Sequence, residues 1–167
     1  MRRNRSTALV IAFLIFAFDQ AAKWVVTVPL DLKGQPGREM NILSFFDLRW
    51  VENTGVSLGL LSAEGALGRW LLVALTAAIA TFVAAWLWRE RKRADSVALA
   101  LVLGGALGNI VDRVRLGYVV DYADLHFGEW RPFLVFNVGD AAITIGVLLL
   151  LVRALLMRDG RPPKKEV

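Results

Sequence analysis

Four long apolar stretches, separated by shorter segments that hold most of the charged residues, dominate the hydrophobic pattern of this chain. They cover residues 7–28, 67–88, 96–113 and 138–157. A run of about 20 mainly apolar residues is long enough to cross the hydrocarbon core of a bilayer as a helix. The pattern therefore predicts four transmembrane helices.

The first apolar stretch follows a short basic segment, which is also how a cleavable signal peptide begins. Two features favour a retained helix instead. Apolar character resumes at Trp24 after the polar residues of 19–23, and no small-x-small cleavage site precedes a polar region. We therefore expect residues 7–28 to form the first of the four spans.

Between the spans, segments 29–66 and 114–137 hold charges, prolines and glycines. Residues 45–52 partly alternate between apolar and polar, which predicts a strand, and Asn53-Thr54-Gly55 predicts a turn. Open sheet edges are not tolerated in lipid, so this sheet should lie at the membrane surface. We expect a mainly α membrane protein, formed as a single domain over 1–167 with four transmembrane helices and a small extracytoplasmic β-cradle or cap.

Composition agrees with a membrane protein and excludes several classes of site. The chain of 167 residues is 56% hydrophobic, with a mean hydropathy of +0.51. It has no cysteine and one histidine, His126, which we interpret as interfacial, so we expect neither a metal nor a cofactor. The net charge of +5 is spread between apolar runs, which argues against a nucleic-acid partner.

The charge distribution predicts the orientation of the spans. Segments 1–6, 89–95 and 153–167 together hold 12 Lys/Arg and 4 Asp/Glu, whereas the rest of the chain holds 8 and 11. Since an excess of basic residues marks the cytoplasmic side, both termini should be cytoplasmic. The polar candidates near the other helix ends then lie toward the extracytoplasmic face.

Two aspartates lie at the edges of apolar segments: Asp121, after Val119-Val120, and Asp140, at the start of the fourth span. A carboxylate at the centre of a membrane helix costs about 2.5–3.5 kcal/mol, so such residues are functional candidates. When two carboxylates share a site, one keeps a proton while the other is charged. The charged one can activate water and the protonated one can donate to a peptide carbonyl. We predict an aspartic dyad.

The third span carries small and polar residues together. Gly104 and Gly108 form a small-xxx-small pair that allows close helix contact, and Asn109 projects near that contact. Asp112 is better explained by a structural role. Arg113 could neutralise a carboxylate or hold a lipid phosphate, or it could be an arginine that snorkels to the interface.

Two other classes of function also fit parts of this pattern. An ion-coupled transporter would place carboxylates in membrane helices, but usually with internal repeats, which the sequence lacks. A non-catalytic scaffold would explain the helices and glycines but not the two aspartates with their flanking asparagines.

Five polar motifs occur in order along the spans, and on them the chain resembles the lipoprotein signal peptidase family (signal peptidase II) over nearly its whole length. They are Asp19-Gln20-x-x-Lys23, Asn53-Thr54-Gly55, Gly104 to Arg113 (GGALGN-x-x-DR), Gly117 to Tyr122 (GYVVDY), and Phe136-Asn137-x-x-Asp140. A single motif of this kind would mean little, but five in order are specific.

The resemblance implies an enzyme that cuts bacterial prolipoproteins on the amino side of a diacylglyceryl-modified cysteine at the inner membrane. Asp121 and Asp140 match the family's catalytic aspartates. Its supporting polar residues match Asp19, Lys23, Asn53, Gly108, Asn109, Arg113 and Asn137. The implied partners are the prolipoprotein, membrane lipid and the inhibitor globomycin, and we expect a monomer.

The sequence departs from the family pattern at two places. Gly139 stands where members commonly have alanine, and Gly55-Val56-Ser57-Leu58 replaces a Gly-Ala-Ala-Phe-like run. Glycine is a poorer helix former by about 1 kcal/mol, which loosens the start of the fourth span slightly. The second departure could alter substrate or inhibitor preference. Neither change touches the aspartates, so we expect activity.

Overall fold

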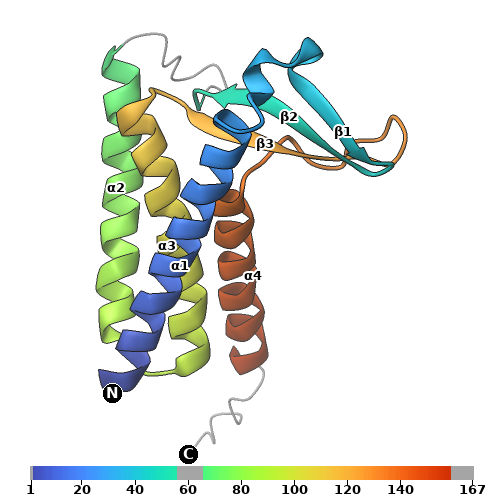
Figure 1. Cartoon of the computed structure of the whole chain (residues 1–167). Helices are drawn as coiled ribbons and strands as arrows, with labels where there is room; N and C mark the ends of the chain where they lie inside the picture. The colour runs from blue at the N-terminus through green and yellow to red at the C-terminus, as the bar shows by residue number, and fades with distance from the viewer. Residues whose placement is uncertain (1, 56–65, 159–167) are drawn as a thin grey trace, which may run out of the picture.

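The computed structural model describes residues 2–55 and 66–158 (Figure 1). Four helices, each long and apolar enough to cross a membrane, form a bundle with a three-stranded sheet at one end. The helices are α1 (Arg2–Thr27), α2 (Ala66–Arg89), α3 (Arg93–Arg115) and α4 (Val138–Arg158). The prediction of a mainly helical fold with four such helices and a small sheet is confirmed. The predicted first span, residues 7–28, ends one residue after the end of α1, which itself begins earlier, at Arg2.

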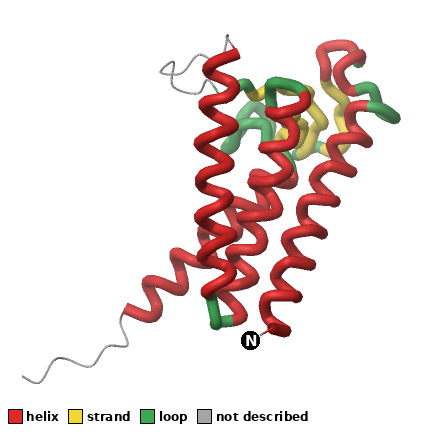
Figure 2. The backbone as a smooth tube through the Cα atoms, turned by 90° about the vertical axis from the view of Figure 1, so that its left-hand side faces the viewer, coloured by secondary structure: helices red, strands yellow, loops and turns green. Residues whose placement is uncertain are grey.

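Helix α3 is the centre of the bundle and packs against α1, α2 and α4 (Figures 1 and 2). Its apolar window is 56% buried, against 22% or less in the other three helices. Its glycines are what let the neighbours approach. A Cβ on Gly104 would meet the Ala12 carbonyl oxygen of α1, and one on Gly105 would meet the Gly139 carbonyl oxygen of α4. The small-xxx-small pair therefore serves contacts within the chain.

The antiparallel sheet has the strand order β1-β2-β3, from Glu39–Leu43, Phe46–Asn53 and Val119–Leu125. Strand β2 was expected from the alternation at 45–52. The predicted turn follows it: the Gly55 N–H donates to the Asn53 side chain at 2.9 Å, with Gly55 at φ +84°. Two 3₁₀ turns, η1 (Leu32–Gly34) and η2 (Pro36–Arg38), connect α1 to β1. Val56, Ser57 and Leu58 lie outside the described residues.

An apolar core joins the sheet to the end of α1. Val26 of α1 and Leu32 of η1 pack with Trp50 of β2 and with Val120 and Tyr122 of β3. The sheet is therefore fixed to the helices at the same end where the polar motifs of the spans lie. Arg69, which interrupts the second span, donates to the carbonyls of Arg113 and Val114 at the end of α3.

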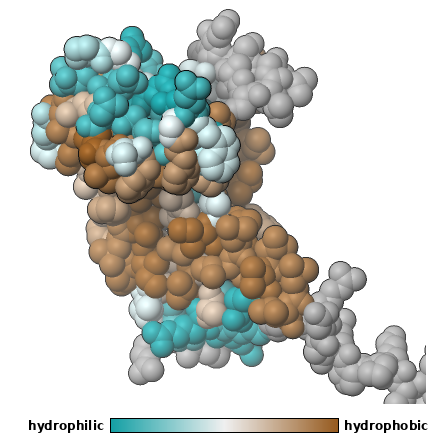
Figure 3. Space-filling view, turned by 90° about the vertical axis from the view of Figure 1, so that its right-hand side faces the viewer, coloured by the Kyte–Doolittle hydropathy of each residue, from teal (hydrophilic) through white to brown (hydrophobic). Residues whose placement is uncertain are grey.

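Large apolar side chains cover the outer surface of the bundle and form a continuous band, while the cap is hydrophilic on its far side (Figure 3). Phe13, Phe82 and Leu156 are each at least 66% exposed. Such a surface is much larger than the apolar patches of soluble monomers and fits contact with lipid chains.

The tight packing at Gly105 predicts a stability effect. Gly105→Ala would press a methyl group against backbone of α4, which cannot move aside as a flexible side chain can. We expect destabilisation of about 1–3 kcal/mol, seen as a lower melting temperature in detergent. Leu107→Ala, on an exposed face of the same helix, serves as the control. Equal melting of Gly105→Ala and wild type would refute the packing argument.

Candidate active site

Asp121 and Asp140 come from different elements that one backbone pairing brings together. Asp121 is buried in the middle of β3, and Asp140 is half-buried in the first turn of α4. Just before α4, Phe136 pairs with Ala123 of β3, through N–H···O contacts of 3.0 and 2.8 Å. The chain therefore enters α4 directly beside the strand that carries Asp121.

Asn137 links the two aspartates. Its side-chain amide donates to Asp121 Oδ1 at 2.6 Å, and its backbone N–H donates to Asp140 Oδ2 at 3.3 Å. In return, Asn137 Oδ1 accepts from the Asp140 backbone N–H at 2.9 Å. This reciprocal arrangement has the geometry of a capping box at the start of a helix. The hydrogen bonds that cap the start of α4 thus also hold the carboxylates of Asp121 and Asp140.

Two further amides complete the surroundings of the carboxylates. Asn53, at the end of β2, donates to Asp121 Oδ2 at 3.0 Å. Asn109 of α3 donates to Asp140 Oδ1 at 2.8 Å. Neutral amide donors from β2, α3 and the start of α4 therefore surround the pair, and the structure brings together all three asparagines that the sequence singled out.

Burial shifts the titration of Asp121. The buried position, and after it the negative charge of nearby Asp140, raises the pKa of Asp121 to about 6. Hydrogen bonds from Asn53 and Asn137 oppose this shift but do not outweigh it. Two interacting carboxyl groups of this kind titrate as a pair, so the site can hold one proton up to a pH of about 6.

Behind the amides lies a buried ion cluster centred on Lys23. Its Nζ contacts Asp19 at 2.8 Å, Asp112 at 2.9 Å and the Asn109 side-chain oxygen at 3.0 Å. Asn137 also donates to that Asn109 oxygen, at 3.2 Å. Since the oxygen of Asn109 is occupied by these donors, its NH₂ group is directed toward Asp140. Lys23 thereby orients a partner of Asp140 without touching that carboxylate.

Asp19 and Asp112 connect the Lys23 cluster to α4 and β3, the elements that carry Asp140 and Asp121. Asp19 accepts from the Gly139 N–H of α4 at 2.8 Å, and Asp112 accepts from the Val120 N–H of β3 at 3.2 Å. Gly108 leaves room for the Asp19 carboxylate, which a Cβ at that position would strike. Gly139 is similarly confined, because a Cβ there would lie 3.0 Å from the Asn137 side-chain oxygen.

Gln20 is a site residue that the sequence reasoning did not select. Its side-chain amide bonds Asp19 at 3.2 Å, Asp112 at 3.1 Å and the Gly108 carbonyl at 3.3 Å. Its place in the first motif, as a polar residue in a membrane helix, was the available signal. The contacts of Asp112 agree with the structural role expected of it.

Arg113 brings a positive charge toward the carboxylates. Its guanidinium interacts electrostatically with Asp140, Asp121 and Asp112. Within the described residues it forms no ion pair at salt-bridge distance, and its buried Nε has no hydrogen-bond partner.

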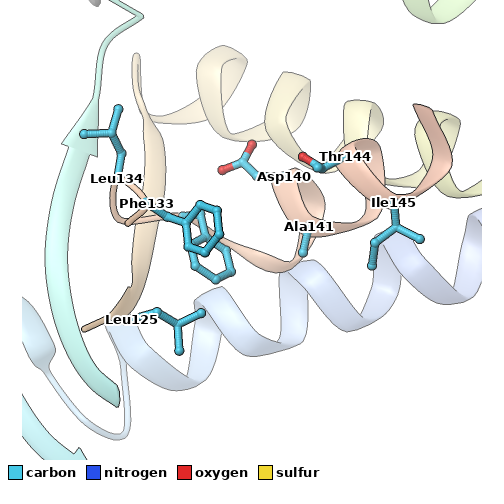
Figure 4. Close-up of a pocket in the computed structure, with 8 residues that line it drawn as sticks. Leu125, Phe133, Leu134, Asp140, Ala141, Thr144 and Ile145 are labelled. Carbon is cyan, nitrogen blue, oxygen red and sulfur yellow. The ribbon is translucent and has the colours of Figure 1, made fainter. Parts of the chain in front are cut away.

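An apolar cavity of about 290 Å³ adjoins Asp140 (Figure 4). Side chains from the end of β3 and from the segment before α4 face the first two turns of α4. The lining consists of Leu125, Phe133, Leu134, Phe136, Asp140, Ala141, Thr144 and Ile145. Asp140 is the only ionisable residue in this lining. No group of three or more His, Cys, Asp or Glu placed to hold a metal occurs in residues 2–55 and 66–158.

Comparison with known proteins gives a consistent result. The family model described as signal peptidase (SPase) II matches residues 11–156. A protein named lipoprotein signal peptidase from Rhizorhabdus wittichii is 54% identical over 164 residues, covering 98% of this chain and 94% of the relative. One of the same name from Sphingopyxis alaskensis is 56% identical over 151 residues, covering 90% and 86%.

The fold has a counterpart among solved structures. A bacterial membrane enzyme determined by the in meso method at 2.3 Å resolution superposes with a TM-score of 0.77 at 28% identity. The match covers 97% of this chain and 94% of the other. With the family match across nearly all of the described residues, this chain belongs to the signal peptidase II family.

Proposed function

We propose that this protein is an aspartic endopeptidase of the bacterial inner membrane, with Asp121 and Asp140 as its catalytic carboxylates. Its substrate is a prolipoprotein, cleaved on the amino side of the diacylglyceryl-modified cysteine. The observation that carries the proposal is the pair of carboxylates, linked through Asn137, at the edge of an apolar cavity. Membership of a peptidase family supports it over the transporter and scaffold alternatives.

In this mechanism the dyad carries one proton. The ionised carboxylate removes a proton from a water molecule, which attacks the scissile carbonyl carbon. The protonated carboxyl donates to the carbonyl oxygen, and a proton is later returned to the departing amine. Burial and the charge of Asp140 favour this state, while the surrounding amides hold the carboxylates without adding a positive charge. Arg113 offsets negative charge as the tetrahedral intermediate forms.

The location of the cavity suits a lipid-anchored substrate. Apolar surface continues from the helix band onto the side of the cap that faces the helices (Figure 3), and Phe127, Trp130, Phe133 and Leu134 of the cap are exposed. The acyl chains can remain in the bilayer while the peptide bond reaches the dyad. Globomycin, the inhibitor implied by the family, would compete for the same cavity.

The proposed orientation places this site on the extracytoplasmic side. The start of α1, the α2–α3 connection and the end of α4 lie at the end of the bundle away from the sheet (Figure 1). These are the basic segments, so the positive-inside rule puts both termini in the cytoplasm and the cap outside. We propose a monomer as the active unit.

The dyad is tested by Asp121→Asn and Asp140→Asn, which keep the shape of the side chain and remove its ability to ionise. We expect each to lower the rate of prolipoprotein cleavage in liposomes by about 100-fold or more, while thermal melts show a folded protein. Asp31→Asn, a change of the same kind at a left-handed position in the cap, should cleave normally. Cleavage by either dyad variant at nearly the wild-type rate excludes that residue as a catalyst.

The shared proton predicts a pH profile. Because the pKa of Asp121 is raised to about 6, the proton is held below that pH and lost above it, so kcat/KM should fall as pH rises through about 6. The Asn53 hydrogen bond favours the ionised form, so Asn53→Ala should raise this pKa and move the alkaline limb to higher pH. Asn41→Ala, on exposed β1, should leave the profile unchanged. A shift to lower pH in Asn53→Ala would contradict the assignment.

Removing Lys23 should damage both stability and activity. Lys23→Met leaves two buried carboxylates without their cation, and breaking a buried pair in this way costs about 3–5 kcal/mol. It also removes one of the two donors to the oxygen of Asn109, so the partner of Asp140 is oriented less firmly. We expect a lower melting temperature and slower cleavage. Lys33→Met, which breaks an exposed pair with Glu52, should do neither. Normal melting of Lys23→Met would show that the cluster is dispensable.

A further inference from the structure

A second cavity, of about 300 Å³, lies on the cap beside the first. Its lining combines Arg49 of β2 and Asp124 of β3 with the segment from Arg131 to Val135. Phe133 and Leu134 line both cavities, so only this short segment separates the second cavity from the one that holds Asp140. The two cavities are therefore neighbours that share one wall.

The second cavity differs from the first in its charge. Asp124 is buried, and one of its oxygens lies 2.9 Å from Arg131 Nε and 3.8 Å from Arg49 Nη1. Both arginine side chains remain more than 40% exposed. The carboxylate thus hydrogen-bonds the Arg131 guanidinium and lies close to that of Arg49, so both groups stand at the cavity wall with N–H donors available. Asp47, opposite Asp124 on β2, is also buried and contacts His126 at 3.0 Å.

Guanidinium groups held in this way are suited to a carboxylate. They are planar and always charged, and they bind a carboxylate through two parallel hydrogen bonds. The buried Asp124 accepts a hydrogen bond from Arg131, and its second oxygen has no hydrogen-bond partner in the described residues. The Asp124 and Asp47 carboxylates are buried, whereas both arginine side chains are partly exposed, with the exposed Glu39 opposite Arg49 on β1.

We propose that this cavity is a specificity subsite for an acidic side chain in the first few residues of the mature lipoprotein. The inference rests on the proposed function. The apolar signal peptide stays in the membrane, so the polypeptide that passes over the cap is the part that follows the cleaved bond. An acidic residue there meets Arg49 and Arg131 while the scissile bond lies at the dyad.

The test compares lipopeptide substrates that differ only in the residues directly after the lipidated cysteine, carrying Asp, Asn or Lys. The full-length enzyme is assayed in nanodiscs of zwitterionic lipid. We expect wild type to favour the Asp substrate over the Asn substrate in kcat/KM by about five- to tenfold, the strength of a charge-assisted hydrogen bond at a partly exposed site. Arg49→Gln should reduce this preference below about twofold.

Charge reversal gives a readout that a structural role would not produce. Arg49→Glu should favour the Lys substrate. Arg38→Gln removes the same charge from another exposed position on the cap and should keep the wild-type preference. Arg49 is the better test residue because Arg131→Gln would remove the closest partner of a buried carboxylate and is expected to destabilise the cap.

Three results would overturn the subsite. Wild type could cleave all three substrates equally, or Arg49→Gln could slow all three by the same factor. Alternatively, activity could depend on Arg49 only when anionic lipid is added and regardless of the peptide, which would assign the arginines to lipid phosphate. Failure of wild type to cleave any of the substrates would instead refute the proposed function.

Discussion

The buried ammonium group of Lys23 is the interaction on which the rest of the site depends. A charge in such a place is costly unless it is paired and hydrogen-bonded. Here Asp19, Asp112 and Asn109 satisfy it from two helices. Through Asp19 the cluster reaches the start of α4, and through Asp112 it reaches β3. The two elements that carry Asp140 and Asp121 are therefore positioned from one charged centre.

The close packing of α3 is what makes this cluster possible. Aspartate and asparagine have short side chains, so they can meet across helices only where the backbones lie close together. Gly104 and Gly108 bring α1 near, and Gly105 brings α4 near. A Cβ at Gly108 would occupy the space of the Asp19 carboxylate. The glycines of α3 therefore account both for the close packing of the helices and for the contacts among the polar side chains at the end of α3.

In this arrangement the charged residues of the Lys23 cluster do not contact the two carboxylates of the proposed catalytic pair. Lys23 neutralises the aspartates that support the site, whereas the dyad contacts neutral amides. Lysine in direct contact with Asp121 and Asp140 would favour ionisation of both carboxylates, and the proton that we propose they share would be lost. Because Lys23 lies behind the amides, its charge is the smallest of the influences on the pKa of Asp121. The raised pKa of Asp121 and the rigid placement of its carboxylate therefore coexist.

The sequence by itself determined the four spans, strand β2 and the polar residues at the helix ends, because these depend on local hydrophobic pattern and residue chemistry. It did not reveal strand β3, since Asp121 and Asp124 interrupt a short apolar segment. The proximity of Asp121 and Asp140, the role of Gln20 and the arginine-lined cavity were decided by the tertiary structure alone. Each depends on contacts between residues distant in the chain, such as the pairing of Phe136 with Ala123, and no local pattern encodes the register of such contacts.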